Sequence, residues 1–567
     1  MMKPRLPMNK FVWRLKGVFK SMGLCVLLVL MGIPEIQAQA RFQQEPDPKF
    51  YPERSVVESI IATIPYQGYD ESQAYFGQGE YEVFLDVVDG VLDRPIIVTD
   101  GFDPGDTRGI GALYASLSFG GQNLADELRA LGYDIIILNA PLYTTGGKDI
   151  DGGGDYIQRN AMVLVALIDY INAEKVGNEE LVVLGPSMGG LIGRYALAYM
   201  EQQGLSHETR LYISFDSPHK GANIPISLQY LINYFAQEFG DPGALATVEF
   251  VLKSPAAKQM LVDHFTGHLA AGSELEQDPN LLAPAGAPGF RTEFQEELDA
   301  LGFPAEVRNV TMINGALNGE GPGSPGMEVI DATLEIDALT DISIALHFAP
   351  LANQTIDVTD VTTYFIGIPL GNYLARARSL ADTDGVDSAP GGTATISSVL
   401  AGGGGNPVLE AFIDALQQDT YCFIPTISAL AIDTPNWYEI PNLNDSPFVN
   451  ISAETNNSAH VSISQVSAQF AIDEIVGMLG SPDESAPATW VRVLNPAKEG
   501  VELAIAPSAQ SEPIQATLYH MNGAILGHHQ WAQGQSRVSW PGSWPPGVYL
   551  LSLTSGRQTA HLRLIIR

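Results

Sequence analysis

The stretch ELVVLGPSMGGLIGRYALAYM, residues 180–200, decides the fold of this chain. Its first part, Leu181–Leu184, is a short continuous apolar run, which is typical of a buried strand in a parallel sheet. After Gly189 the apolar residues recur at helical spacing. A strand that ends in a tight turn and continues at once as a helix is the repeating unit of α/β proteins.

The turn inside this stretch, Gly185–Gly189, matches the pattern G-x-S-x-G. Because the chain contains 56 Gly, the pattern alone is weak, and its placement between a strand and a helix carries the prediction. In such a turn the serine adopts a strained backbone conformation that lifts its hydroxyl above the sheet, so the residues two positions away must be small. We therefore predict that Ser187 is a nucleophile; the alternative is a serine that only caps the helix.

The same alternation continues on both sides of this stretch. It predicts an α/β fold, a parallel sheet covered by helices on both faces, whose functional sites lie at the carboxyl ends of the strands. The predicted strands are 80–88, 95–102, 133–140, 180–187, 211–217 and 307–315, and the predicted helices are 123–131, 155–175 and 189–202.

Two long segments interrupt the alternation and are predicted to be insertions. Residues 222–300 contain helical patterns and are expected to form a cap, whereas residues 318–418 begin with alternating strands and end in glycine-rich loops. A Pro- and Ser-rich acidic segment, 481–489, is the clearest linker in the chain. The main α/β domain is therefore expected to span residues 41–480.

Three runs of the sequence resemble the α/β-hydrolases of the lipase and esterase superfamily: GPSMGGLIGRYALAYME (185–201), DGFDPGD (100–106) and SFDSPHKGANIP (214–225). The nearest likeness within the superfamily is to GPI inositol-deacylase-like proteins and to bacterial lipases with an S/T-P-H-x-G turn. Over the whole chain, the likeness is to secreted α/β-hydrolases of Bacteroidetes-type bacteria. The resemblance implies an α/β-hydrolase fold whose serine, acid and histidine follow in that order along the chain.

A histidine is needed as a base, because a serine hydroxyl is a poor nucleophile until its proton is removed. Among ten histidines, His460 lies in a polar loop that leads directly into an amphipathic helix, which is where the hydrolase order places the base. The alternative is an exposed loop histidine. His219 follows the Phe-Asp-Ser-Pro turn, and the resemblance suggests that it stabilises this turn.

The acid of the expected triad has several candidates. Asp216 ends the strand 211–217 and resembles the acid of animal lipases that carry it after the sixth strand. We favour Asp216 because a strand end fixes the geometry that a hydrogen bond to the base requires; its alternative role is a buried residue that organises the turn around His219. The remaining candidates are Asp387, Asp419, Asp433 and Glu320.

The oxyanion hole is expected to combine the backbone amides of Met188 and Phe102. Asp-Gly-Phe at 100–102 occupies the place where many lipases have His-Gly-Phe or His-Gly-Trp, so Asp100 departs from that pattern. The following Asp-Pro-Gly-Asp run lacks the spaced acidic pattern of a calcium loop. We therefore expect no metal and no cofactor.

The charge is unevenly distributed along the chain. The net charge is −35, yet residues 1–40 carry six Lys or Arg and one Glu. This basic start, the apolar run 22–33 and the Ala38-Gln39-Ala40 end are typical of a secretory signal peptide, and the run is shorter than a membrane span. The acid excess elsewhere argues against nucleic acid and anionic membrane surfaces as partners. Cys422, flanked by apolar residues, is expected to be a buried structural cysteine.

Residues 490–567 alternate in short strands and predict a small β-sandwich. The runs LYHMNGAILG, PPGVYLLSLTSGRQ and HLRLIIR resemble the C-terminal sorting domain of the type IX secretion system. Positions that match or correspond to recurrent ones in that family are Gly523, Gly547, Tyr549, Arg563 and Arg567, the two arginines standing where Lys is common.

The resemblance to a sorting domain implies that the type IX machinery is a partner and that the protein is secreted or attached to the outer-membrane surface. A carbohydrate-binding module is the structural alternative, because Trp540 and Trp544 could line a platform for a sugar. We expect these two residues to pack an edge of the sandwich instead.

These observations together predict an exported carboxylic-ester hydrolase that acts on lipids or acylated substrates through an acyl-enzyme on Ser187. The helical insertion 222–300 is expected to wall the acyl pocket. Acyl transfer or amide hydrolysis is an alternative, because the same triad serves both reactions. A non-catalytic surface protein on a hydrolase fold is a further alternative, against which the intact Ser187 and His460 argue.

Overall fold

The computed structural model describes residues 56–400, 407–477, 491–493, 501–505, 512–520, 525–542, 544, 547–556 and 558–566. The expected signal peptide (1–40) and linker (481–489) lie outside the described residues. Within the described part, no helix has the length and apolar character needed to cross a membrane.

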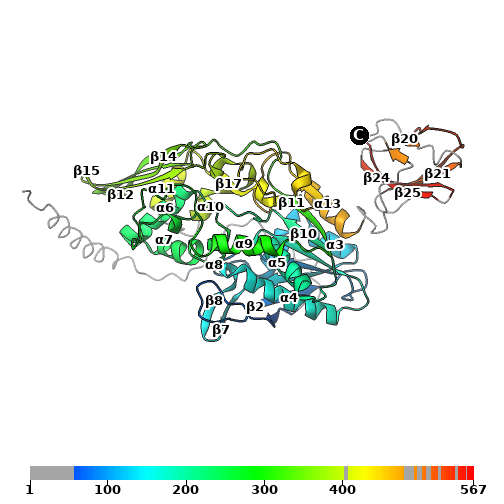
Figure 1. The fold of residues 1–567 in the computed structure, drawn as a ribbon, viewed down its shortest axis with the longest axis horizontal. Coiled ribbons are helices and arrows are strands. Elements are labelled where there is room, and N and C mark those ends of the chain that lie inside the picture. Colours follow the sequence, from blue (N-terminus) through cyan, green and yellow to red (C-terminus); the bar gives the residue numbers. More distant parts are fainter. Residues whose placement is uncertain are drawn as a thin grey trace, which may run out of the picture. The chain divides into compact units, whose positions relative to one another are not determined.

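An eight-stranded sheet forms the centre of the main domain (Figure 1). From β6 to β18 each neighbouring pair is parallel, whereas β1 and β2 join the edge in antiparallel fashion. The order is β1 (Glu58–Ile61), β2 (Gln78–Phe84), β6 (Asp134–Asn139), β3 (Pro95–Thr99), β9 (Leu181–Pro186), β10 (Thr209–Phe215), β11 (Arg308–Ile313) and β18 (Asn450–Ala453).

Helices cover both faces of this sheet, as the sequence predicts. Alternate strand residues face opposite sides: Ile97 and Val183 pack with α4 (Ile157–Glu174) and α5 (Met188–Gln203). Ile96 and Val182 pack on the other side, and the helices there are α2 (Ile110–Ser116), α3 (Leu124–Ala130) and α13 (Gln465–Ile475). The predicted α/β-hydrolase architecture, with its doubly covered parallel sheet, is therefore confirmed.

The insertion after β10 is helical. Arg194 of α5 fastens it to the main domain, because its buried guanidinium donates to the carbonyl oxygens of Leu298 and Gly302, both at 2.7 Å, at the end of α9. Cations at a helix C-terminus are favourable because the last carbonyl groups carry partial negative charge. The segments are α6 (Ile226–Tyr234), η2 (Phe235–Phe239), α7 (Pro242–Ala246), η3 (Thr247–Leu252), α8 (Pro255–Met260), η4 (Phe265–Gly267) and α9 (Arg291–Leu301).

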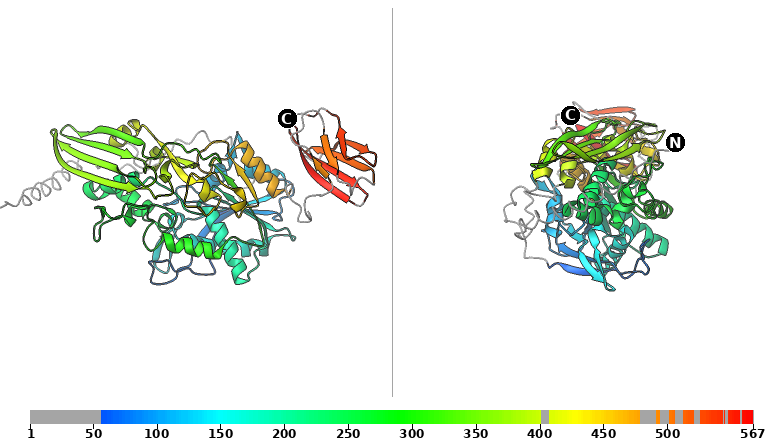
Figure 2. Two further views of the ribbon diagram at one scale, coloured as in Figure 1. Left: turned by 45° about the horizontal axis from the view of Figure 1, so that its top comes forward. Right: turned by 90° about the vertical axis from the view of Figure 1, so that its left-hand side faces the viewer.

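The second insertion is a four-stranded antiparallel sheet that packs on the first insertion (Figure 2). The Thr359 hydroxyl donates to the Ser227 carbonyl oxygen at 3.0 Å, and the rings of Tyr234 and Tyr373 stack with centroids 5.0 Å apart. The two insertions therefore form one unit, in which helices of the first insertion pack on the sheet of the second. Its strands are β12 (Glu328–Asp337), β13 (Thr340–His347), β14 (Thr355–Phe365) and β15 (Ile368–Arg378).

The chain returns from this sheet through a short antiparallel pair, β16 (Gly391–Thr395) and β17 (Thr420–Pro425). Thr393 of β16 forms an isolated parallel bridge with Ala459, next to the predicted base. The smaller elements are the hairpins β4 (Ser118–Phe119) with β5 (Gln122–Asn123) and β7 (Leu142–Thr145) with β8 (Lys148–Asp151), η1 (Gly152–Gly154), η5 (Val386–Ser388), α10 (Ile396–Leu400), α11 (Pro407–Asp414), α12 (Thr426–Ala429) and η7 (Leu443–Asp445).

The C-terminal part consists of two sheets that share a core of their own, in agreement with the predicted β-sandwich. Trp540 belongs to this core, and Trp544 packs against it edge-on, so they pack the sandwich as expected. Gly523 and Arg567 lie outside the described residues. The sheets are β19 (Val491–Val493), β20 (Val501–Ile505) and β23 (Arg537–Trp540), and β22 (Ile525–Trp531), β21 (Ile514–His520), β24 (Gly547–Ser555) and β25 (Gln558–Ile566).

Candidate active site

Ser187 lies at the turn between β9 and α5 with φ 54° and ψ −129°. Few L-residues adopt this conformation, so the serine is held there by its surroundings. The flanking glycines permit the turn: a Cβ at Gly185 would come within 2.5 Å of Gly189, and a Cβ at Gly189 within 2.5 Å of the Thr99 hydroxyl. The strained turn expected from the G-x-S-x-G pattern is present.

Three predicted site residues meet at this turn. His460 Nε2 lies 2.8 Å from Ser187 Oγ, and His460 Nδ1 lies 2.7 Å from Asp216 Oδ2. Because a carboxylate only accepts hydrogen bonds, Nδ1 carries the imidazole proton and Nε2 accepts from the serine hydroxyl. This is the chain of donors and acceptors that allows a histidine to take a proton from a serine.

Asp216 is held rigidly at the end of β10. Its side chain is 0% exposed, its backbone has φ 48°, and its amide donates to the Met312 carbonyl oxygen at 2.7 Å. Its second carboxylate oxygen, Oδ1, accepts from the Asn314 amide at 3.0 Å. With one oxygen bound to a backbone amide and the other to the imidazole, the carboxylate can take only one orientation.

His460 follows β18, the last strand of the sheet, which the sequence did not reveal. Its amide donates to the Thr393 carbonyl oxygen at 2.9 Å. The edge of its ring meets the Phe423 ring, with the centroids 4.9 Å apart and the planes at 81°. The imidazole is therefore fixed by the main chain on one side and by an aromatic ring on the other.

The other acid candidates are engaged elsewhere. Asp387 accepts from the Asn223 side-chain amide at 3.0 Å and from the Ala349 amide at 2.7 Å, and burial raises its pKa to about 6. Asp419 accepts from the amide and hydroxyl of Ser397. The remaining two are exposed at the surface, Asp433 and Glu320.

The residues expected to form an oxyanion hole border Ser187. Met188 is the first residue of α5, so its amide has no acceptor within the helix. The loop that holds Phe102 also lies against the nucleophile, because a Cβ placed on Gly101 would be 3.3 Å from Ser187 Cβ. The first turn of α5 and the loop that holds Phe102 therefore both border the nucleophile, and the prediction that their amides form an oxyanion hole remains a prediction.

Asp100, the departure from the lipase pattern, stabilises this loop. Its Oδ1 accepts from the Gly101 amide at 2.7 Å and from Arg108 Nη2 at 3.2 Å, and the same Nη2 donates to the Phe102 carbonyl oxygen at 3.0 Å. Oδ2 is buried without a partner among the described residues. Desolvation by burial raises the pKa of Asp100 to about 7, although Arg108 opposes the shift.

His219 and Cys422 are buried and stand apart from the hydrogen-bonded chain at Ser187. His219 Nε2 lies 2.9 Å from the Ser214 hydroxyl, its ring packs against Phe303 and Phe448, and burial lowers its pKa well below the usual value. Burial raises the pKa of the Cys422 thiol, so this cysteine is structural, as expected.

One group of residues within the described part has the spacing of metal ligands: Glu201, His207 and Glu306. His207 Nδ1 accepts from the Thr209 amide at 3.1 Å, so Nε2 carries the proton and donates toward Glu201 at 3.3 Å. The Glu201 carboxylate also accepts from the Glu306 amide at 2.9 Å. With this tautomer His207 has no free lone pair for a cation, and the three residues are joined by hydrogen bonds through Glu201.

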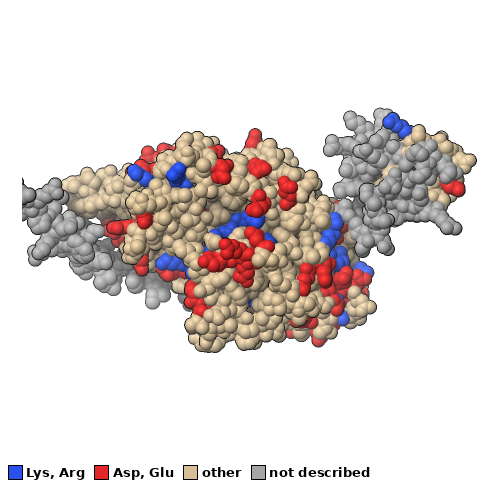
Figure 3. Space-filling view, in the orientation of Figure 1, with Lys and Arg blue, Asp and Glu red and all other residues tan. Residues whose placement is uncertain are grey.

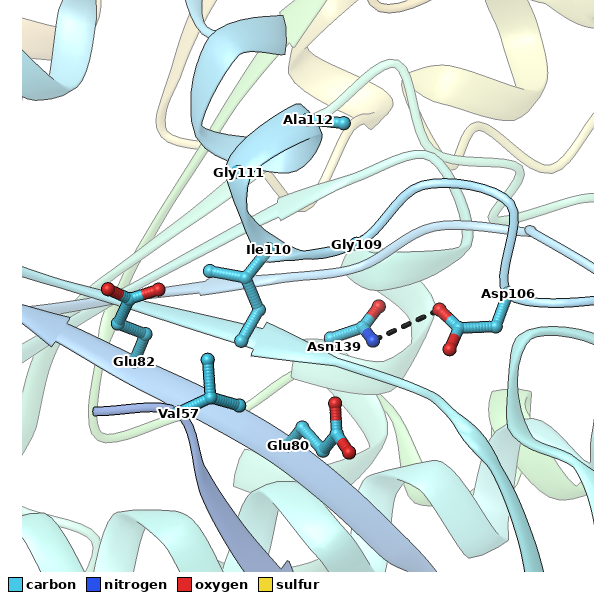
Figure 4. Close-up of a pocket in the computed structure, with 9 residues that line it drawn as sticks. All are labelled: Val57, Glu80, Glu82, Asp106, Gly109, Ile110, Gly111, Ala112 and Asn139. Atoms are coloured by element: carbon cyan, nitrogen blue, oxygen red, sulfur yellow. Dashed lines mark hydrogen bonds between the residues drawn. The ribbon is translucent and has the colours of Figure 1, made fainter. Parts of the chain in front are cut away.

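A cavity of about 370 Å³ lies beside β2, the end of β6 and the start of α2 (Figure 4). No member of the Ser187–His460–Asp216 group lines it, so it is separate from the candidate site. The Asn139 side-chain amide donates to Asp106 at 3.1 Å across one end. Its lining residues are Val57, Glu80, Glu82, Asp106, Gly109, Ile110, Gly111, Ala112 and Asn139.

Sequence reasoning missed the residues that hold the site together. Asn314 donates to Asp216, Thr393 accepts from His460, and Arg108 holds the loop that contains Gly101 and Phe102. Asn314 and Thr393 act mainly through their backbone, which leaves no residue-type signal. Only the role of Arg108 could have been inferred from residue type, because a buried carboxylate such as Asp100 requires a nearby cation or hydrogen-bond donors.

Residues 147–238 match the family model described as "Putative serine esterase (DUF676)". No curated protein sequence matches the chain. Among solved structures, the chain is similar to Est1E from Butyrivibrio proteoclasticus, with 12% identity over 42% of this chain and 74% of that one and a TM-score of 0.22. A structure described under fungal esterases from Rhizomucor miehei is similar at 12% identity, over 55% of this chain and 74% of that one, with a TM-score of 0.22.

The α/β-hydrolase architecture and the match of residues 147–238 to the "Putative serine esterase" model support a serine hydrolase. The matched segment contains both Ser187 and Asp216, whereas His460 lies beyond its end.

Proposed function

We propose that this protein hydrolyses carboxylic esters through an acyl-enzyme formed on Ser187. The observation that carries the proposal is the continuous relay from Ser187 through His460 to the buried Asp216, with hydrogen bonds of 2.8 and 2.7 Å. A buried carboxylate that orients an imidazole, which in turn contacts a strained serine, has the arrangement of a nucleophile, a base and an orienting acid.

In the first half-reaction, Ser187 Oγ attacks the acyl carbonyl carbon while its proton moves to His460 Nε2. Asp216 stabilises the imidazolium that forms, and the amides of Met188 and Phe102 bind the carbonyl oxygen as it becomes negatively charged. The protonated His460 then donates its proton to the leaving alcohol. Water then attacks the acyl carbon while it gives a proton to His460, the bond to Ser187 Oγ breaks, and His460 returns the proton to Oγ as the acid leaves.

The surroundings of the serine favour an apolar acyl group. Phe423 packs on His460, and Phe102 is adjacent to Gly101, which borders Ser187. Apolar walls with a few placed polar groups are the usual lining of sites for small ligands. We therefore include lipids and acylated small molecules as the substrate class, and we propose that the helical insertion contributes further apolar surface to the acyl site.

We also propose that the protein works outside the cytoplasm. The support is the basic and apolar pattern of residues 1–40 and the resemblance of residues 490–567 to type IX sorting domains. Export is tested by following the protein in cell fractions with and without residues 1–40; retention of the full chain in the cytoplasm would contradict the proposal.

The reaction itself is tested with p-nitrophenyl esters and a fluorophosphonate probe, which reacts with activated serines. We expect Ser187→Ala to lower kcat by roughly 10⁴-fold or more and to abolish labelling, with an unchanged thermal melt. The matched control is Ser116→Ala, which removes an exposed hydroxyl on α2. Ester turnover that persists in Ser187→Ala would overturn the mechanism.

A further inference from the structure

The antiparallel sheet of the second insertion ends in two adjacent turns with large apolar side chains. The turn between β12 and β13 holds Leu339, and the turn between β14 and β15 holds Ile366. The Ile366 amide donates to the Leu339 carbonyl oxygen at 2.7 Å, so the turns are joined. The exposed fractions are 52% for Leu339, 64% for Ile366, 64% for Ile368 and 55% for Leu370, and we call these four residues the apolar tip.

The backbone conformation at the apolar tip is unfavourable for an isoleucine, the residue found at position 366. Ile366 has φ 51° and Gly367 has φ 71°, so both central residues of this tight turn are left-handed. Asn-Gly is the preferred pair in such a turn, because a β-branched side chain is poorly accommodated there. An exposed isoleucine in this place makes no contribution to the core that would offset its strain, which indicates a use for the side chain outside the fold.

The apolar tip lies far from the end at which the sheet is anchored. At the anchored end, the Ala349 amide donates to buried Asp387, which also holds Asn223. Strand β14 has 11 residues, which corresponds to about 36 Å at 3.3 Å per residue. Tyr234 of the first insertion also stacks on Tyr373 and lies 3.4 Å from the Thr363 hydroxyl, so the sheet is supported close to the apolar tip.

The net negative charge of strands β12 to β15 indicates which kind of surface the apolar tip can approach. From β12 to β15, residues 328–378, there are seven Asp or Glu and two Arg, and both arginines, Arg376 and Arg378, lie at the end of β15 that is remote from the tip. Figure 3 shows the end of the sheet near the β12 and β15 labels of Figure 1 as mostly uncharged surface. Acidic residues behind an apolar tip repel an anionic surface, whereas they leave insertion into an uncharged or zwitterionic one unopposed.

We infer that the apolar tip inserts into a zwitterionic phospholipid surface and brings the hydrolase to ester substrates held there. The inference rests on the proposed ester hydrolase, and it adds the physical state of the substrate. A second protein copy fits the tip less well, because stable protein interfaces take about 20–30 residues from each partner, whereas the tip offers four side chains on two convex turns. Binding at the boundary between headgroups and acyl chains grows with the apolar area buried there, to which the four side chains of the apolar tip would contribute.

The test uses the purified full chain and phosphatidylcholine vesicles in a sedimentation assay. We expect the double variant Ile366→Asn/Ile368→Ser to lower the partition coefficient by about tenfold or more. Vesicles that contain phosphatidylglycerol should bind the wild-type protein less tightly than phosphatidylcholine alone. The matched control is Val176→Ser, which changes an aliphatic residue of 61% exposure away from the tip and should leave vesicle binding unchanged.

Measurements of Tm and of the hydrolysis of a soluble ester distinguish a loss of membrane docking from damage to the fold. Ile366→Asn relieves the left-handed strain, so its Tm should rise by about 1–2 °C while vesicle binding falls. Hydrolysis of a soluble short-chain p-nitrophenyl ester should be unchanged in the tip variants, whereas hydrolysis of an ester embedded in vesicles should fall with binding. Vesicle binding by Ser187→Ala should equal that of the wild type, so a failure of the proposed chemistry would not be confused with a failure of docking.

Three results would overturn the inference: no binding of the wild type to phosphatidylcholine, stronger binding to the anionic vesicles, or equal binding by the tip variants. Analytical ultracentrifugation tests the alternative that the apolar tip binds a second copy of this chain. A wild-type dimer that the tip substitutions dissociate would assign the apolar tip to a second copy of this chain instead of to lipid.

Discussion

Gly392 lies directly against Asp216: a Cβ added to this glycine would overlap the carboxylate oxygen that binds His460. The next residue, Thr393, accepts a hydrogen bond from the His460 amide at 2.9 Å. Both belong to β16, through which the chain returns from the strand-rich insertion. The return segment of the insertion therefore contacts both Asp216 and His460 and fixes their relative position.

We predict that Gly392→Ala impairs catalysis without unfolding the protein. The new methyl group must displace the Asp216 carboxylate, and a shift of about 1 Å in a catalytic group can cost about 10²-fold in rate. We expect kcat for a soluble ester to fall by about 10–100-fold with little change in KM. Gly371→Ala is the matched control, since no atom lies within 4 Å of a Cβ on this glycine of β15. Equal rates in the two variants would contradict the assignment.

The orienting role of Asp216 gives a second prediction. Asparagine in its place can donate to Nδ1 and favours the wrong imidazole tautomer, so Asp216→Asn should lower kcat by roughly 10⁴-fold. Asp433→Asn should leave kcat unchanged, because this side chain is 95% exposed and its carboxylate lies 3.7 Å from Lys220 Nζ. Asp387→Asn is expected to lower Tm more than kcat, since Asp387 binds Asn223 and Ala349. Steady-state kinetics and thermal melts of the three variants check these outcomes.

The central sheet could be predicted from sequence because its strands leave a strong local pattern. Buried parallel strands such as Ile96–Val98 and Leu181–Leu184 are continuous apolar runs, and α4 shows clear helical spacing. The short strand β18 has only four residues, of which Ser452 alone is buried. It carries no pattern that distinguishes it from a loop, and it was missed.

The candidate site was predictable to the extent that residue type limits chemistry. Ser187 followed from its turn, His460 from its place before an amphipathic helix, and Asp216 from its strand end. The supports were not predictable, because Gly392 and Thr393 are 68 and 67 residues distant from His460 in sequence and act through a missing side chain and a carbonyl oxygen. Contacts of this kind depend on the path of the chain and leave no mark in residue type.

The strained backbone at Ser187 predicts a difference in stability between two variants that both lack the nucleophile. At φ 54° and ψ −129° a side chain is unfavourable, and strain of this kind costs about 1–3 kcal/mol. Glycine adopts the conformation freely, so Ser187→Gly should be more stable than Ser187→Ala, although both are inactive. Urea unfolding of the two variants measures the difference. Because both lack the hydroxyl, a larger stability for the alanine variant would show that the turn is unstrained.

Asp100 predicts how stability depends on pH. The carboxylate is surrounded by Arg108, which lowers its pKa, and by Asp103 and Asp106, which raise it, and burial is the largest influence. The resulting pKa of about 7 exceeds the value of about 3.9 for an aspartate in an unfolded chain. Between these values the folded protein binds a proton that the unfolded chain releases, so this group's contribution to stability is complete below about pH 4 and is lost as the pH rises through about 7.

We therefore predict that the wild-type free energy of unfolding, measured relative to Asp100→Asn, falls between pH 4 and pH 7 and is constant above about pH 8. The slope within this window should approach 1.4 kcal/mol per pH unit, which is the value for one titrating proton. Arg108→Gln removes the cation that lowers the pKa, so it should extend the decline to higher pH. Urea titrations of the three proteins at each pH provide the measurement. A difference between wild type and Asp100→Asn that is constant with pH would mean that Asp100 ionises at its ordinary value and that burial of this loop is incomplete.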